Sequence, residues 1–157
     1  MAFVIRPATA ADLVPLAALC AALWPESPAE DHAREIAPLL DGRTVPPLPG
    51  IYLLAVIDGF ADRAGLAGFL QAGLRSHADG CDPAHPVGYV EGWYVEASCR
   101  GRGIGRALLA AAEDWARNYG CREMASDALI ANEPSQRVHE TLGFEVVDRC
   151  VHYRKPL

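Results

Sequence analysis

Residues 100–106 alternate arginine with glycine around a single isoleucine, in the order R-G-R-G-I-G-R. Glycines lack a Cβ, so the backbone at Gly101, Gly103 and Gly105 can approach a ligand closely. An amphipathic helix is predicted over residues 104–119, and the first amides of a helix have no acceptor within it. These amides, the positive end of the helix dipole and the three arginines predict a site for an anion such as a pyrophosphate.

The glycine turn does not have the spacing of the common nucleotide-binding motifs. A dinucleotide fingerprint requires glycine or alanine where the chain has Arg106, or Leu108 in the alternative frame. The Gly-Lys-Ser or Gly-Lys-Thr ending of a P-loop is also absent from the sequence. Two interpretations remain, a turn chosen for its geometry and an anion site, and the interleaved arginines favour the anion site.

The elements that must position this turn follow from hydrophobic periodicity and from helix start and stop signals. Strands are predicted over residues 3–6, 51–57, 66–75, 87–95 and 124–127, helices over 9–23, 29–40, 104–119 and 132–142, and one or two final strands over 144–154. A strand, helix and strand in succession around the turn require a parallel pair. The sequence therefore predicts a single α+β, or mixed α/β, domain over residues 1–157.

Composition narrows the classes of partner. The chain has 157 residues, 51% of them hydrophobic, which suits one domain with a real core. A net charge of −6 disfavours nucleic acid and anionic membranes and favours cationic partners. The N-terminal residues do not resemble a signal peptide, so a cytoplasmic location is expected. The five cysteines lack the spacing of a zinc site, so no metal is expected.

The segment 93–109 resembles motif A of the GCN5-related N-acetyltransferases (GNAT), whose signature is Arg or Gln, two residues, Gly, one residue, and Gly or Ala. Residues 5–13 and 132–144 are also similar to this family. The resemblance implies a central mixed, mostly antiparallel sheet with one splayed parallel pair, flanked by about four helices, and acetyl-CoA as cosubstrate. It implies cofactor contacts from Trp93, Tyr94, Val95, Arg100, Gly101, Arg102, Gly103, Ile104, Gly105, Arg106 and Asn132.

Five separate blocks, residues 23–25, 80–82, 90–92, 120–127 and 152–155, resemble the aminoglycoside 6′-N-acetyltransferase subgroup of this family. That resemblance implies acetyl transfer to the 6′-amine of these polycationic antibiotics, and hence resistance. It implies that the substrate is contacted by Trp24, Glu91, Asp127 and Asp148. Carboxylates suit such a partner, because they hold ammonium groups by charge-assisted hydrogen bonds.

The chain departs from the subgroup at two substrate positions. Relatives have a histidine shortly after the Trp-Pro pair, where this chain has Ser27, and a tyrosine before the Gly-Cys-Asp block, where His77 is the nearest substitute. The expected substrate set therefore includes Ser27 and His77, and the departures bear on which antibiotics are preferred.

Acetyl transfer requires a neutral amine, a polarised thioester carbonyl and a proton for the leaving thiolate. Glu91 or Asp127, directly or through water, could take the amine proton, and a backbone N–H near Tyr94 or Val95 could polarise the carbonyl. The family often has a tyrosine acid at the position of His139, so this histidine could protonate the thiolate or could simply pack beneath the cofactor. No cysteine lies in a recognisable nucleophile setting, so direct transfer is expected.

Two alternatives to this function stay open. The same fold could acetylate another small polyamine or a peptide amine, or the chain could be a non-catalytic acyl-CoA sensor. The subgroup resemblance also implies a homodimer built partly from C-terminal strands. Residues 146–154 suit either such an exchange or a hairpin within one chain.

Overall fold

The computed structural model describes residues 2–42, 47–60 and 62–157. Within these ranges one sheet has the order β1-β2-β3-β4-β5, and its first three pairings are antiparallel. The fourth pairing, between β4 and β5, is parallel. The strands are β1 (Val4–Pro7), β2 (Gly50–Val56), β3 (Leu66–Arg75), β4 (Val87–Val95) and β5 (Met124–Ser126).

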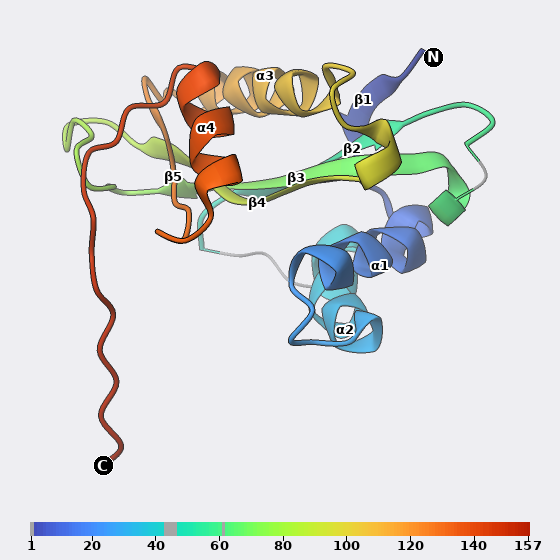
Figure 1. Ribbon diagram of the computed structural model, residues 1–157, viewed down its shortest axis with the longest axis horizontal. Helices are drawn as coiled ribbons and strands as arrows, with labels where there is room; N and C mark the ends of the chain where they lie inside the picture. Colours follow the sequence, from blue (N-terminus) through green and yellow to red (C-terminus); the bar gives the residue numbers. More distant parts are fainter. Residues whose placement is uncertain (1, 43–46, 61) are drawn as a thin grey trace.

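Helices cover both faces of the sheet (Figure 1). They are α1 (Leu13–Leu23) and α2 (Ala29–Leu40) on one face, and α3 (Ile104–Asn118) and α4 (Glu133–Thr141) on the other. Each face has its own core. Leu16 and Leu19 of α1 pack on Phe69 of β3 on one face, and Leu108 of α3 and Leu70 of β3 are buried on the other. Each such side chain stabilises the fold by about 1.5–3 kcal/mol.

The predicted mixed α/β class, the four helices and the parallel pair are confirmed. The parallel ladder stops at Val90 and Ser126, whereas β4 continues to Val95. The two strands therefore separate beyond Val90, as expected for a splayed pair, and that edge of β4 is not paired with another described strand. No helix in the described ranges is long and apolar enough to cross a membrane.

A β-bulge on β4 sets the direction of the side chains next to the splay. Gln71 pairs with Gly92 and Ala72 with Val90, so Glu91 is an extra residue in the ladder. A bulge of this kind re-aims the side chains around it. Gly92 lies against Trp24 on the α1 side of the sheet, and Trp93 packs on the α3 side.

The predicted final strands over residues 144–154 are wrong. Residues 142–157, all of which the structure describes, form no helix or strand, and the chain runs away from the sheet (Figure 1). A strand needs a partner for its backbone groups, and this segment lies along no edge of its own sheet. Its apolar side chains Val146, Val147, Val151 and Tyr153 are exposed, the last to 93%. The intramolecular hairpin is therefore absent from this chain.

Candidate active site

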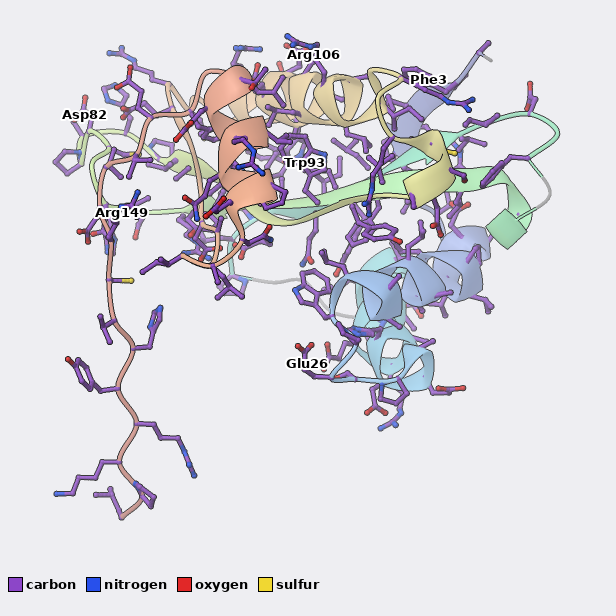
Figure 2. All side chains as sticks on the ribbon, in the orientation of Figure 1. Phe3, Glu26, Asp82, Trp93, Arg106 and Arg149 are labelled. Carbon is purple, nitrogen blue, oxygen red and sulfur yellow. The ribbon has the colours of Figure 1, made fainter. Side chains whose placement is uncertain are left out.

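A long groove lies between the end of β4, the glycine turn and α4. Its wider part has a volume of about 530 Å³ and its outer part about 410 Å³. The two parts share Trp93, Gly101, Gly103, Gly105, Pro134 and Val138. Figure 2 shows Trp93 between α3 and the sheet, beside α4, with Arg106 at the outer side of α3. The groove thus joins the predicted anion site to the splayed edge of β4.

The glycine turn has the geometry of an anion cradle. Gly101 and Gly103 have φ values of +73° and +81°, which other residues rarely adopt. The first backbone bond of α3 runs from Ala107 N to Gly103 O at 3.0 Å, so the preceding amides have no acceptor within the helix. A Cβ at Gly105 would lie 3.2 Å from the indole of Trp93, so this glycine lets α3 and β4 close together.

The three arginines of the turn have different positions. Arg100 Nε donates to the Val95 carbonyl at 2.9 Å, and its guanidinium lies 5.8 Å from the centre of the Tyr94 ring. Arg100 therefore ties the turn back to β4. Arg106 is exposed and lines the outer groove, where it can meet an anion, and Arg102 is exposed.

Asn132 and His139 enter the groove from α4. Asn132 caps this helix, because its Oδ1 accepts a hydrogen bond from Ser135 N at 3.2 Å. His139 Nδ1 lies 2.8 Å from the Ser135 carbonyl, which can only accept, so Nδ1 carries a proton. In the neutral ring Nε2 then accepts from Ser126 Oγ, at 2.9 Å. Both ring nitrogens are engaged, and the ring meets Trp93 edge-on at 5.6 Å.

A charged network lies on the α1 side of the sheet, next to the bulge. The guanidinium of Arg75 donates to both oxygens of Glu91, at 2.9 and 3.1 Å from Nη2. Its carbon lies 3.3 Å from the centre of the Tyr89 ring, a cation–π contact. Tyr89 in turn donates its hydroxyl proton to Asp127 Oδ2 at 3.1 Å. The two predicted carboxylates, Glu91 and Asp127, are thus joined through Arg75 and Tyr89.

The titration of this network follows from its burial and charge. Burial, and next the charge of Asp127, raises the pKa of Tyr89 to about 12. The neighbouring acids Glu91 and Asp127 help to raise the pKa of Arg75, against the effect of its burial. Near neutral pH Tyr89 therefore stays a hydrogen-bond donor and Arg75 stays a cation.

Trp24 forms the wall of this face at the bulge. A Cβ at Gly92 would overlap the indole of Trp24, so the glycine is required for the ring to lie on the backbone beside Glu91. The indole also packs near Phe69 and His32, with ring centres 6.1 and 6.0 Å apart. The structure thereby brings the predicted residues Trp24 and Glu91 together.

Ser27, His77 and Asp148 lie on three separate segments. The Ser27 amide lies 3.4 Å from the Trp24 carbonyl, and His77 contacts Ser76 Oγ at 3.2 Å. Asp148 is in the C-terminal segment and accepts from the amide of Arg149. The preceding residue, Val147, packs against Gly80, which sets this segment beside the loop that carries Asp82 (Figure 2). None of these contacts reaches the Glu91–Asp127 network.

Sequence reasoning missed two residues of the network, Arg75 and Tyr89. Tyr89 and Glu91 are two residues apart, as residues on one face of a strand are, but a bulge at Glu91 changes which later residues of β4 share that face. Arg75 closes β3, and its contact with Glu91 depends on the register Gly73↔Tyr89 between the two strands. The arginine at the end of β3 and the tyrosine and glutamate of β4 could be connected only once the register between the two strands is known.

Residues 16–144 of the chain match the acetyltransferase (GNAT) family. The aminoglycoside N(6′)-acetyltransferase type 1 of Stenotrophomonas maltophilia is 37% identical over 153 residues, covering 98% of this chain and 93% of that protein. The enzyme of the same name from Salmonella typhimurium is 41% identical over 137 residues, covering 85% of each chain. The structure of AAC(6′)-Iy in complex with the bisubstrate analog CoA-S-monomethyl-acetylneamine matches with a TM-score of 0.83 and 35% identity, covering 100% of both chains. The chain belongs to the GNAT family of acetyltransferases.

Proposed function

We propose that this protein transfers the acetyl group of acetyl-CoA to the 6′-amine of aminoglycosides. The relatives of 37% and 41% identity bear the name of this activity. The observation that carries the proposal is the bulge itself. Within three residues, Glu91 points to the charged network beside Trp24, while Trp93 lines the groove that ends at the anion cradle. An acceptor amine and a thioester can therefore meet at one point of β4.

The groove fits acetyl-CoA by the chemistry of its lining. The amides at the start of α3 suit the pyrophosphate, and Arg106 lies at the outer part of the same groove. The edge of β4 beyond Val90 can pair with the amide groups of the pantetheine arm, as an added strand would. We assign polarisation of the thioester carbonyl to a backbone N–H near Tyr94 or Val95.

The two carboxylates differ in how they are already engaged, and this suggests different roles. Arg75 donates to both oxygens of Glu91. A carboxylate already paired with a cation is a poor base, so we assign Glu91 to binding an ammonium group of the substrate. Asp127 is exposed, and Tyr89 donates to its Oδ2. We assign proton removal from the amine, directly or through water, to Asp127. His139, engaged at both nitrogens, positions Trp93 and the end of β5; it could release a proton to the thiolate only from its doubly protonated form.

Direct transfer is supported by the setting of four of the five cysteines; the fifth, Cys150, is exposed in the C-terminal segment. Cys99 lines the groove but is only 2% exposed. Burial raises the pKa of Cys20 to about 12 and also raises that of Cys81 and Cys121, which leaves little nucleophilic thiolate. Incubation with acetyl-CoA alone should leave the intact mass of the protein unchanged. A stoichiometric gain of one acetyl group that is lost on adding kanamycin would contradict direct transfer.

The exposed valines and the lack of strand pairing over residues 144–154 support the proposal of a homodimer. In such a dimer, residues 144–154 of each protomer would pair with the sheet of the other protomer and bury the apolar side chains that a single chain leaves exposed. Light scattering of the full chain should give a dimer, and deletion of residues 146–157 should give a monomer. A full chain that is monomeric at micromolar concentration would contradict the proposal.

The competing acceptors are separated by a panel of amines. Kanamycin and tobramycin should release CoA thiol rapidly with acetyl-CoA, whereas spermidine and a peptide with a free N-terminus should not. Turnover of the peptide or spermidine alone would favour the alternative substrates, and cofactor binding without turnover of any amine would favour a sensor. Because acetyl-CoA is a cytoplasmic metabolite, we place the reaction there, and expression in a sensitive bacterium should raise its resistance to both antibiotics.

A further inference from the structure

The cation that neutralises Glu91 comes from the protein itself. Arg75 reaches Glu91 from the end of β3 and lies across the Tyr89 ring. Gly73, which is opposite Tyr89 in the ladder, lies beside this pair, because a Cβ there would be in ordinary van der Waals contact with Glu91 Oε1, at 3.6 Å. The Arg75 guanidinium thus contacts the Glu91 carboxylate and the Tyr89 ring, and the Asp127 carboxylate lies on the far side of Tyr89.

These features suit a cation in general and not only arginine. The side chains of Arg75 and Glu91 are 42% and 34% exposed, so solvent and solutes can reach the pair. An ion pair of this exposure contributes little net free energy and can be exchanged for another ion pair. The tyrosine face and the charge of Asp127 would attract an ammonium group for the same reason that they attract the guanidinium.

We propose that Arg75 is a resident competitor, a cation that an ammonium group of the aminoglycoside displaces from Glu91, and that this competition makes the site select polycationic acceptors. The inference rests on the proposed function and assigns Arg75 a role in specificity. An acceptor with one ammonium must break the Arg75–Glu91 pair and gains one new pair in return. A polycation pairs with Glu91 and Asp127 together, so it outcompetes the guanidinium where a monoamine does not.

Removing the competitor should strengthen acceptor binding. In Arg75→Gln the KM for kanamycin should fall about two- to fivefold, the range expected for an exposed ion pair, while the KM for acetyl-CoA should stay the same. The preference for kanamycin over a simple aminomethyl sugar should fall by a similar factor. Arg117→Gln is the matched control, because Arg117 pairs with Glu113 and Asp114 on the surface of α3. It should leave all constants as they are.

A second measurement separates competition from a purely structural role. Added guanidinium chloride at millimolar concentration should inhibit Arg75→Gln competitively with kanamycin, and more strongly than sodium chloride does at equal ionic strength. The unaltered enzyme should respond equally to the two salts. Arg75→Lys keeps the charge but loses the paired donors, so its KM for kanamycin should lie between that of the unaltered enzyme and that of Arg75→Gln. This variant replaces Arg75→Gln in the test if Arg75→Gln does not fold.

The outcomes are distinct. A kanamycin KM that rises or does not change in Arg75→Gln and Arg75→Lys, or an absent guanidinium effect, overturns the competitor role and leaves the acetyltransferase activity standing. Failure of the unaltered protein to acetylate kanamycin at all refutes the proposed function instead.

Discussion

The proposed cofactor groove and the proposed acceptor face, which is the Arg75–Glu91–Tyr89–Asp127 network, meet at the β4 bulge, but different parts of the chain build them. The anion cradle of the groove is made by backbone amides of one short segment, residues 101–106, whose glycines set the geometry. The acceptor face is made by side chains from distant parts of the chain, such as Arg75, Glu91 and Asp127. The first is a fixed arrangement of dipoles, and the second is a set of exchangeable ion pairs.

This difference suggests how the two substrates are recognised. Backbone amides are present whatever the side chain, so only a substitution that shifts the backbone itself, as at a glycine with positive φ, can change how the groove binds its cosubstrate. Charged side chains can be exchanged one at a time at small cost in folding, because most of them are partly exposed. The acceptor face is therefore the place where the preference for one amine or another is set.

The largest effect is expected on the acceptor side. Asp127→Asn keeps the hydrogen bond from Tyr89 but removes the base, so kcat for kanamycin should fall about 100-fold or more. Initial-rate thiol release measures this, and calorimetric titration with CoA should show unchanged binding. Glu91→Gln should instead raise the KM for kanamycin more than it lowers kcat. If Asp127→Asn retained kcat, the assignment of the base would be wrong.

The cofactor side is tested by two glycines at the opposite ends of α3. Gly103 and Gly120 have φ values of +81° and +83° with open space around the Cβ position, so alanine at either should cost about 1–2 kcal/mol of unfolding free energy. Only Gly103→Ala should disturb the cradle and raise the KM for acetyl-CoA, by about tenfold, the cost of one charge-assisted hydrogen bond. Urea unfolding and steady-state kinetics give the two quantities. Equal KM values would show that the cradle is not where the pyrophosphate binds.

A smaller effect is expected where α4 meets the groove. His139→Gln retains a polar contact with Ser126 but has no ring to pack on Trp93, so kcat should fall less than tenfold. The shape of the pH profile of kcat should stay the same. If His139→Gln instead lost the high-pH limb of the kcat profile and lowered kcat 100-fold, His139 would be the proton donor.

The smallest effect on activity is expected from a change in the scaffold away from both regions. Hydrogen bonds from Arg6, and then from Thr9, lower the pKa of Asp12 to about 2. The ionised Asp12 therefore stabilises the folded state fully above about pH 4, and this contribution to the unfolding free energy is lost as the pH falls towards 2. Asp12→Asn should lose about 1–2 kcal/mol of unfolding free energy at pH 7 and flatten the acid dependence between pH 4 and 2, with kcat unchanged. A stability difference that persists undiminished at pH 2 would contradict this account.

The cofactor groove was readable from the sequence because its determinants are contiguous. Glycine spacing, the helix start and the strand before the turn all lie within residues 93–109, and the structure places them as predicted. Glu91 and Asp127 of the proposed acceptor face were predicted only through resemblance, and they stay a prediction. The contact between Arg75 and Glu91 depends on a one-residue bulge and on strand register, which no local pattern encodes.

The failed prediction at the C-terminus has a related cause. The valines and aromatic residues of 144–154 have strand propensity, but such a segment becomes a strand only where a partner edge is available. Nothing in the segment itself states whether the partner is in the same chain. The described chain leaves Val151 and Tyr153 exposed and gives this segment no strand to pair with.

The central claim is that the junction at the β4 bulge joins acetyl-CoA to a 6′-amine. The direct measurement uses two aminoglycosides that differ only in carrying an amine or a hydroxyl at the 6′ position, each incubated with acetyl-CoA, with thiol release followed and the product mapped by NMR. The account predicts turnover of the amine alone and an acetyl group on the 6′ nitrogen. Equal turnover of both compounds, or acetylation at another amine, would contradict it.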